Sequence, residues 1–324
     1  MRMPGKIAWN HARTSPMLKP SSRSEASTRW LPRRLSQTGC VDAQHPSAPV
    51  AGAIAYDVRV PFWSDGAKKQ RYLYLPPGKR VRVLADGDLE VPPGSVLVKN
   101  FFLKEQLFET RFYVRHSDGE YSGYAYAWDA EGRDATLVEE TRVAKVRGKD
   151  WVFPGRDACN QCHTSAAGFT LGLELRQLDI AEASGSQLSR LVAQGVFESP
   201  PGNVGRPFST EAPEPLASRA RAYLHTNCSG CHRPKGPGRV GLDLRFDTPL
   251  GDTGLCERAE LGPLSGPAER PALLLAPGHP RQSVLHQRLS RRGPNQMPPL
   301  ASLAVDTRGA ALIGEYIHSL ASCP

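Results

Sequence analysis

The pentapeptide Cys-x-x-Cys-His occurs twice in this chain, at residues 159–163 and 228–232. Its spacing is the one that attaches a c-type haem, because two thiols three residues apart can reach the two vinyl groups of one porphyrin. The adjacent His is then held beneath the iron as its proximal ligand. We therefore expect two covalently bound haem c groups. The expected attachment residues are Cys159, Cys162, Cys228 and Cys231, and the expected iron ligands are His163 and His232.

Two other uses of such cysteines fit the sequence less well. A zinc ribbon places its Cys-x-x-Cys pairs roughly 15–20 residues apart, whereas these motifs begin at residues 159 and 228. A redox dithiol needs no His directly after its second Cys, and here that His is present both times. Haem attachment is the interpretation that explains all six residues.

Size and charge narrow the class of protein further. A chain of 324 residues has room for two or three domains. The net charge of +9 is spread along the chain with acidic residues interspersed, and no basic block is interleaved with aromatics, so we do not expect a nucleic-acid partner. No run of about 18 apolar residues is present, so we expect no transmembrane segment.

The expected location and the N-terminal sequence disagree. Haem is attached to this motif outside the bacterial cytoplasm, so a periplasmic protein is expected. Residues 1–48 are rich in Ser, Arg and Pro and contain no apolar stretch typical of a signal peptide. We interpret them as a disordered or mis-annotated N-terminal segment.

The sequence predicts an α+β multi-domain fold. Residues 49–148 contain short β-type runs separated by turn residues, which indicate an antiparallel, β-sandwich-like domain. Residues 149–204 hold the first motif and a linker, and residues 205–324 hold the second; both are expected to be mainly α-helical. Within the β region, the Trp-Ser-Asp-Gly at residues 63–66 is expected to be a tight turn, with a binding site as the alternative.

The order of features from about residue 216 resembles the class I cytochrome c fold, in which an N-terminal and a C-terminal helix cross beside the haem. A helix is expected at 216–225 and another at 306–322, capped by Asp306 and with an apolar stripe that includes Ile313 and Ile317. In that family a Met followed by Pro is the sixth iron ligand, and Met297 matches it. Met297 is the only Met after residue 17. His/Met coordination raises the reduction potential and suits an electron carrier.

The sixth ligand of the first haem is open. His225 is the first candidate, because it could bring the two haems together; the alternative is that it hydrogen-bonds near its own haem. His116 is a weaker candidate, and an open distal side is the third possibility. Among the other cysteines, Cys256 and Cys323 are the natural disulfide pair in an oxidising compartment, which leaves Cys40 alone.

From about residue 45 to its end, the chain resembles an uncharacterised family of bacterial di-haem c-type cytochromes, often encoded beside parallel β-helix repeat proteins. The segments that carry the resemblance are VPFWSDGAKKQRYL (60–73), PPGSVLVKNFFL (92–103), FPGRDACNQCHTSAAGFTLGLELRQLD (153–179), AYLHTNCSGCHRP (222–234), LDLRFDTPL (242–250) and QMPPL (296–300). The resemblance implies periplasmic haem binding and electron transfer.

The function expected from the sequence is electron transfer by a periplasmic di-haem cytochrome to or from a redox protein, such as a dehydrogenase or another cytochrome. Arg233 and Arg245 are candidate partners of the haem propionates. Two alternatives remain: a peroxidase-like enzyme with an open or weakly ligated first haem, and a cytochrome subunit of a separate dehydrogenase.

Overall fold

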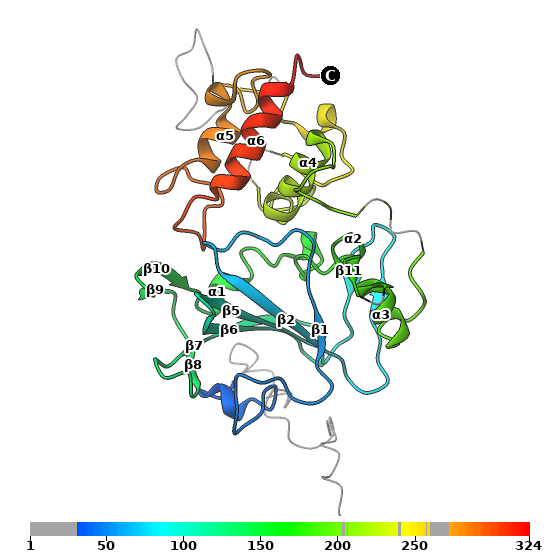
Figure 1. Cartoon of the computed structure of the whole chain (residues 1–324), viewed down its shortest axis with the longest axis vertical. Helices are drawn as coiled ribbons and strands as arrows, with labels where there is room; N and C mark the ends of the chain where they lie inside the picture. Colours follow the sequence, from blue (N-terminus) through cyan, green and yellow to red (C-terminus); the bar gives the residue numbers. More distant parts are fainter. Residues whose placement is uncertain are drawn as a thin grey trace, which may run out of the picture.

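The computed structural model describes residues 31–183, 185–202, 205, 207–238, 241–256, 258–259 and 272–324. At its centre lies a six-stranded antiparallel sheet with the order β1-β2-β5-β6-β7-β8 (Figure 1). The strands are β1 (Ile54–Tyr56), β2 (Lys68–Tyr74), β5 (Val96–Leu103), β6 (Gln106–Arg115), β7 (Tyr121–Trp128) and β8 (Ala135–Val138). The antiparallel β region expected from the sequence is confirmed. In the part of the chain described, however, loops and hairpins cover this sheet, and no second large sheet faces it.

Successive side chains of a strand point to opposite faces of the sheet, and these strands carry apolar residues on both faces, as a sheet covered on both sides requires. We call the face that carries Leu73, Leu97 and Tyr113 the odd face; the opposite, even face carries Tyr74 and Phe112. All five side chains are buried. Tight turns join the strands: in the β6–β7 turn, Gly119 adopts a φ of 89°, which residues with a Cβ rarely reach.

Residues 31–41 cover the even face, which differs from the expectation that residues 1–48 stand apart from the fold. Leu31, Leu35 and Cys40 are buried with Tyr74 and Phe112 in one apolar cluster. The segment includes a short 3₁₀ turn, η1 (Leu35–Gln37), and lies on the side of the sheet away from the C-terminal helices (Figure 1). The few apolar residues of this Ser- and Arg-rich segment therefore contribute to the core. The composition of residues 1–48 as a whole does not reveal this contribution. Residues 1–30 lie outside the described part of the chain.

The odd face is covered at one end by chain that follows the first motif. Leu173, Leu178 and Leu191 pack there against Leu97 and Tyr113. At the other end a hairpin packs its Trp151 and Phe153 against the sheet. The hairpin and the elements around the first motif are β9 (Arg142–Val146), β10 (Lys149–Phe153), α1 (Arg156–Cys159), η2 (Ser165–Ala167), α2 (Leu175–Leu178) and α3 (Gln187–Ala193), with the small pairs β3 (Arg82–Val83) and β4 (Leu89–Glu90), and β11 (Ala181–Glu182) and β12 (Gly185–Ser186).

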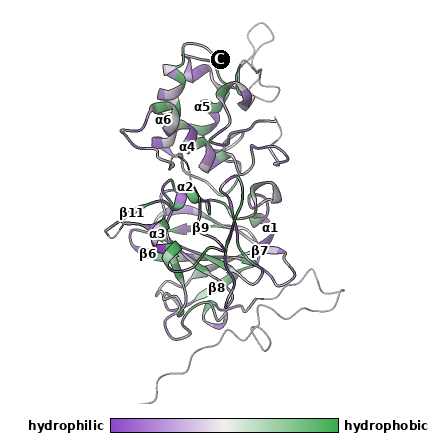
Figure 2. Ribbon diagram, turned by 90° about the vertical axis from the view of Figure 1, so that its right-hand side faces the viewer, coloured by the Kyte–Doolittle hydropathy of each residue, from purple (hydrophilic) through white to green (hydrophobic). Residues whose placement is uncertain are grey.

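The last part of the chain packs three helices around a separate apolar core. Figure 2 shows these helices grouped together, and Figure 1 shows them at the end of the molecule opposite residues 31–41. They are α4 (Leu216–Cys228), α5 (Val284–Leu289) and α6 (Thr307–Ser319), with 3₁₀ turns η3 (Leu250–Thr253) and η4 (Pro280–Gln282). The terminal helix is confirmed: Asp306 accepts a hydrogen bond from the Gly309 N–H, and Ile313 and Ile317 are buried. Helices α4 and α6 pack closely, since a Cβ at Gly309 would lie 2.2 Å from the ring of Tyr223.

The expectation of a mainly α-helical haem region is wrong. Around the first motif, helices α1 and α2 have four residues each and α3 has seven. Loops make up much of the rest, because the 29 prolines and 30 glycines of the chain favour turns over helix interiors. The fold is therefore α+β.

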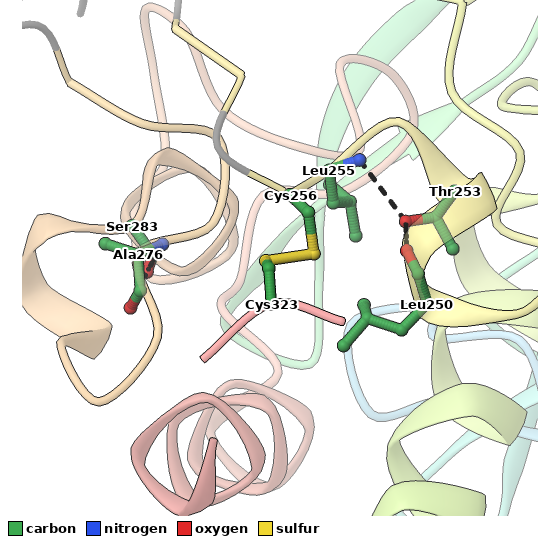
Figure 3. The surroundings of a disulfide bond; sticks show 7 residues. All are labelled: Leu250, Thr253, Leu255, Cys256, Ala276, Ser283 and Cys323. Atoms are coloured by element: carbon green, nitrogen blue, oxygen red, sulfur yellow. Dashed lines mark hydrogen bonds between the residues drawn. A yellow bond between two sulfur atoms is a disulfide. The ribbon is translucent and has the colours of Figure 1, made fainter. Parts of the chain in front are cut away.

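The expected Cys256–Cys323 disulfide is present and joins the end of the chain to the loop after η3 (Figure 3). Next to it, Thr253 accepts a hydrogen bond from the Leu255 N–H and donates one to the Leu250 carbonyl. Among the described residues, no helix is both long and apolar enough to cross a membrane.

Candidate haem-attachment sites

The first motif begins at the last residue of α1. Its backbone turns tightly, with the N–H of His163 donating to the Cys159 carbonyl at 3.0 Å. The His163 ring is fixed by a 2.6 Å contact between Nδ1 and the Phe169 carbonyl. Since a carbonyl only accepts, Nδ1 carries the proton and Nε2 keeps its lone pair. Burial, with a smaller contribution from Lys99, lowers the pKa of His163 to about 3, so the ring is neutral at physiological pH, as a metal ligand must be.

The sheet forms the surface beneath this motif. Tyr113 on β6 packs against the His163 ring with 4.1 Å between ring centroids, and its hydroxyl donates to the His163 carbonyl at 3.3 Å. On β7, Gly123 leaves room for Cys159: a Cβ there would lie 2.4 Å from the Cys159 Sγ. The β region therefore shapes the first site directly, a role that the sequence left open.

The second motif is built in the same way at the end of α4. The N–H of His232 donates to the Cys228 carbonyl at 2.9 Å, and the His232 carbonyl accepts from the Leu244 N–H at 2.9 Å. A Cβ on Gly238 would lie 2.6 Å from Nδ1 of His232, so only glycine fits beside the ring. This buried Nδ1 has no hydrogen-bond partner among the described residues. Burial lowers the pKa of His232, with Arg288 adding to the effect.

The two motifs lie side by side, although their first residues, Cys159 and Cys228, are 69 positions apart in the sequence (228 − 159). A hydrogen bond between the thiols of Cys162 and Cys231 lowers the pKa of Cys231 and raises that of Cys162. The Cys231 thiol also lies 3.9 Å from the Gln161 carbonyl. The Thr164 hydroxyl donates to the Gly230 carbonyl at 3.5 Å.

Arg233, expected as a propionate partner, is instead part of this junction. Its guanidinium donates to the Ala166 carbonyl at 3.1 Å and to the Ser229 carbonyl at 2.8 Å, which ties the loops after the two motifs together. Arg245, the other expected partner, is held by Asp243 at 2.6 Å. Both guanidinium groups are therefore already engaged in this structure.

Met297 lies in the loop between α5 and α6. Its N–H donates to the Arg288 carbonyl at 3.0 Å. Arg288, near the end of α5, also lowers the pKa of His232. The residue to which the Met297 backbone is bonded is therefore within electrostatic range of the second motif. No bond of the Met297 sulfur to a described residue is present, and its role as a ligand stays a prediction.

The Trp-Ser-Asp-Gly segment joins the β region to this same loop. Asp65 is only 5% exposed, and its carboxylate accepts hydrogen bonds from the Ser302 hydroxyl and from the N–H groups of Leu303 and Ala304, at 2.8–3.1 Å. The Trp63 indole donates to the Ala304 carbonyl at 2.9 Å. The expected tight turn is confirmed, with the Ala67 N–H donating to the Ser64 carbonyl at 2.8 Å. The sequence did not predict that this turn also clamps the two halves of the chain together.

His225 is held at both ring nitrogens. Nδ1 accepts from the Phe246 N–H at 2.9 Å, and Nε2 lies 3.1 Å from Glu174. Binding of iron by His225 would require one of these contacts to break. His116, the weaker candidate, is buried with its Nε2 3.2 Å from the Tyr124 hydroxyl.

The residues at each motif fit a covalently attached haem. Each pentapeptide offers two thiols and a neutral imidazole, and a glycine leaves room beside it. Among the described residues, no three His, Cys, Asp or Glu side chains are grouped to hold a metal ion. A haem does not need such a group, because its porphyrin supplies four of the iron ligands and the protein one or two.

Comparisons with known proteins add no relative. No protein-family model matches the chain, and no curated protein or solved structure matches it either.

One feature beside the first motif was not predicted from the sequence. Arg71, Lys99 and Arg111 lie in one row on the odd face, next to Tyr113 and Gly123. The signal was present, since each cation occupies a position where strand alternation calls for an apolar residue. It could not be interpreted without the register that brings the three strands together.

Proposed function

We propose that the chain is a periplasmic di-haem c-type cytochrome that transfers electrons between redox proteins. The observation that carries the proposal is the contact between the two Cys-x-x-Cys-His motifs, in which the Cys231 sulfur lies 3.9 Å from the Gln161 carbonyl and the Thr164 hydroxyl donates to the Gly230 carbonyl. Two attachment loops in contact suit a pair of neighbouring redox centres. A haem at each motif would supply a one-electron couple.

The residues around the motifs perform the tasks that an electron carrier requires. Phe169 fixes the proton of His163 on Nδ1, so that Nε2 faces the metal side in a single tautomer. Arg233 holds the two loops in a fixed relation, which keeps the distance between the centres constant. Asp65 anchors the loop that follows Met297, the expected sixth ligand at the second motif. Rigid surroundings of this kind limit rearrangement when the charge of the iron changes.

A second candidate, a peroxidase-like enzyme, is favoured by one observation. His225, the first candidate for sixth ligand at the first motif, has both ring nitrogens engaged by Phe246 and Glu174. If no other residue takes its place, the distal side of the first haem is open to small molecules. A cytochrome subunit of a separate dehydrogenase would need an exposed apolar patch on the β region for docking. In the described part of that region, Val143 is the only large apolar side chain that is exposed, so no such patch supports this alternative.

The test is production with a c-type haem maturation system, followed by haem quantification and mass spectrometry. Two haems per chain are expected; a chain with none would overturn the proposal. A carbon monoxide difference spectrum of the reduced protein then separates the two candidates. No spectral change means that both irons have six ligands and supports the carrier. A change equivalent to one haem means an open site and supports the enzyme.

A further inference from the structure

A row of three cations crosses the odd face of the sheet. The strand register places Arg71 on β2 opposite Lys99 on β5, and Lys99 opposite Arg111 on β6. The row ends at Ala125 on β7, a residue too small to cover its neighbour. Directly opposite residues on one face have their Cβ atoms only about 5 Å apart, so these three charges are close neighbours.

The row lies in a polar gap between two apolar clusters. On one side Leu73, Leu97 and Tyr113 belong to the core that covers the first motif. On the other side Phe101 packs with Trp151 of the hairpin. Positive charges placed between two apolar clusters lose part of their hydration, and they are retained only where negative charge compensates them.

The chain itself compensates the row incompletely. Arg71 forms an ion pair with Asp57, and Arg111 forms two parallel hydrogen bonds with Glu109 at 2.8 and 2.9 Å. Among the residues that the structure describes, none is hydrogen-bonded to the Lys99 ammonium, and no acidic residue forms an ion pair with it. Burial, together with Arg71 and Arg111, lowers the pKa of Lys99 to about 7.

A fourth basic residue lies beside the row. Lys69, two residues before Arg71 on the same face, donates to the Phe62 carbonyl, which is neutral. Burial, together with Arg71, Lys99 and Arg111, lowers the pKa of Lys69 well below 10.5, so Lys69 adds little positive charge. Asp57 and Glu109 compensate Arg71 and Arg111, which leaves the Lys99 ammonium as the uncompensated charge that a propionate carboxylate would neutralise.

The row is next to the first motif and within electrostatic range of its His. One row further along the same strands, Tyr113 packs on the His163 ring and Gly123 lies under Cys159. Lys99 and Arg111 both lower the pKa of His163. A haem held by Cys159 and His163 would therefore have these cations as neighbours.

We propose that Arg71, Lys99 and Arg111 bind the propionate carboxylates of the haem at the first motif, an assignment that rests on the proposed function. The chemistry is charge-assisted hydrogen bonding of a carboxylate by guanidinium and ammonium groups.

The test is a redox titration of the matured protein and its Lys99→Gln variant, after haem quantification shows two haems in each. The step that a Met297→Ala change leaves unaltered is assigned to the first haem. A nearby positive charge favours the reduced iron, so Lys99→Gln should lower the midpoint potential of this step. We expect about a tenfold change in the ratio of reduced to oxidised haem, equal to about 59 mV for a one-electron couple.

Two variants control for effects of structure. Lys99→Arg keeps the charge and should keep the potential of the unaltered protein. Lys68→Gln removes a charge from β2 on the opposite face, where Lys68 is 73% exposed, and should shift neither step. If Lys99→Gln does not fold, Lys99→Met, which keeps the length of the side chain, replaces it.

Three outcomes overturn the assignment. The first is an unchanged potential in Lys99→Gln with both haems present. The second is an equal shift in Lys99→Arg, which would assign the effect to packing rather than charge. The third is a shift of the same size when acetate or inorganic phosphate is added to the unaltered protein, because the row would then bind free anions. A protein without haem would instead refute the proposed function.

Discussion

The clamp made by Asp65 leads to a quantitative prediction about how the two halves of the chain depend on each other. Its carboxylate accepts three hydrogen bonds from residues 302–304, across the boundary between the sheet and the C-terminal helices. Asp65→Asn is the sharpest perturbation, because it keeps the shape of the side chain. Asn also tolerates the left-handed backbone at this position, where φ is 49°. Backbone strain is therefore not added.

The magnitude follows from the bonds that change. The Asn carbonyl can keep the two donors on Oδ1, the Ser302 hydroxyl and the Ala304 N–H, as neutral bonds. The Asn amino group then faces the Leu303 N–H, which loses its acceptor. A buried donor without a partner costs about 1–3 kcal/mol, and two bonds that lose their charge assistance cost about 0.5–1 kcal/mol each. We expect Asp65→Asn to lower the free energy of unfolding by about 2–5 kcal/mol.

The assay is urea denaturation followed by two probes, circular dichroism, which reports on the C-terminal helices, and tryptophan fluorescence. Asp65→Asn should move the helical transition to lower urea concentration, ahead of the fluorescence transition. Asp42→Asn is the matched control: Asp42 accepts the N–H groups of Gln44 and His45 at 2.8 Å, but within one exposed turn. It should change stability much less. Coincident transitions in Asp65→Asn, unshifted from those of the unaltered protein, would refute the clamp.

Three further predictions concern attachment, the disulfide and pH. Gly123→Ala should reduce haem content from two to one per chain by mass spectrometry, because its Cβ would lie 2.4 Å from the Cys159 Sγ; retention of both haems would contradict it. Cys323→Ser removes the disulfide to Cys256, which closes a loop with a sequence separation of 67. Calorimetry should show that the free energy of unfolding falls by about 4 kcal/mol, as the chain-entropy estimate gives. An unchanged unfolding temperature would contradict this prediction. Burial and neighbouring acids raise the pKa of Asp88 from 3.8 to about 6, so the folded state binds this proton more tightly than the unfolded state. The free energy of unfolding should therefore fall as pH rises from about 4 to 6. Asp88→Asn should lessen that fall by at most about 3 kcal/mol, and an equally steep fall in the variant would contradict the prediction.

Much of the fold could be predicted because its signals are local. Alternation and turn residues gave the antiparallel strands, and the Asp306 cap with its apolar stripe gave the last helix. The error concerned the regions around the motifs, where short helical patterns suggested more helix than α1, α2 and α3 contain. Residues 31–41 were set aside with the tail, since their burial depends on a sheet face formed by strands much later in the chain.

The same distinction between local signals and distant contacts applies to the candidate site. The candidate attachment residues are recognised by spacing within a pentapeptide, so the sequence alone predicts Cys159, Cys162 and His163 and their counterparts at the second motif. The pairing of Cys256 with Cys323 also followed from the residues that remained once those four thiols were assigned.

Only the tertiary structure decided which residues surround those motifs. The contact between Cys162 and Cys231, and the bonds from Asp65 to the loop after Met297, join positions far apart in the chain. The row of Arg71, Lys99 and Arg111 exists because antiparallel register aligns one residue from each of three strands. Register depends on the packing of a whole sheet rather than on neighbouring residues, which is why no pattern along the chain could show these sites.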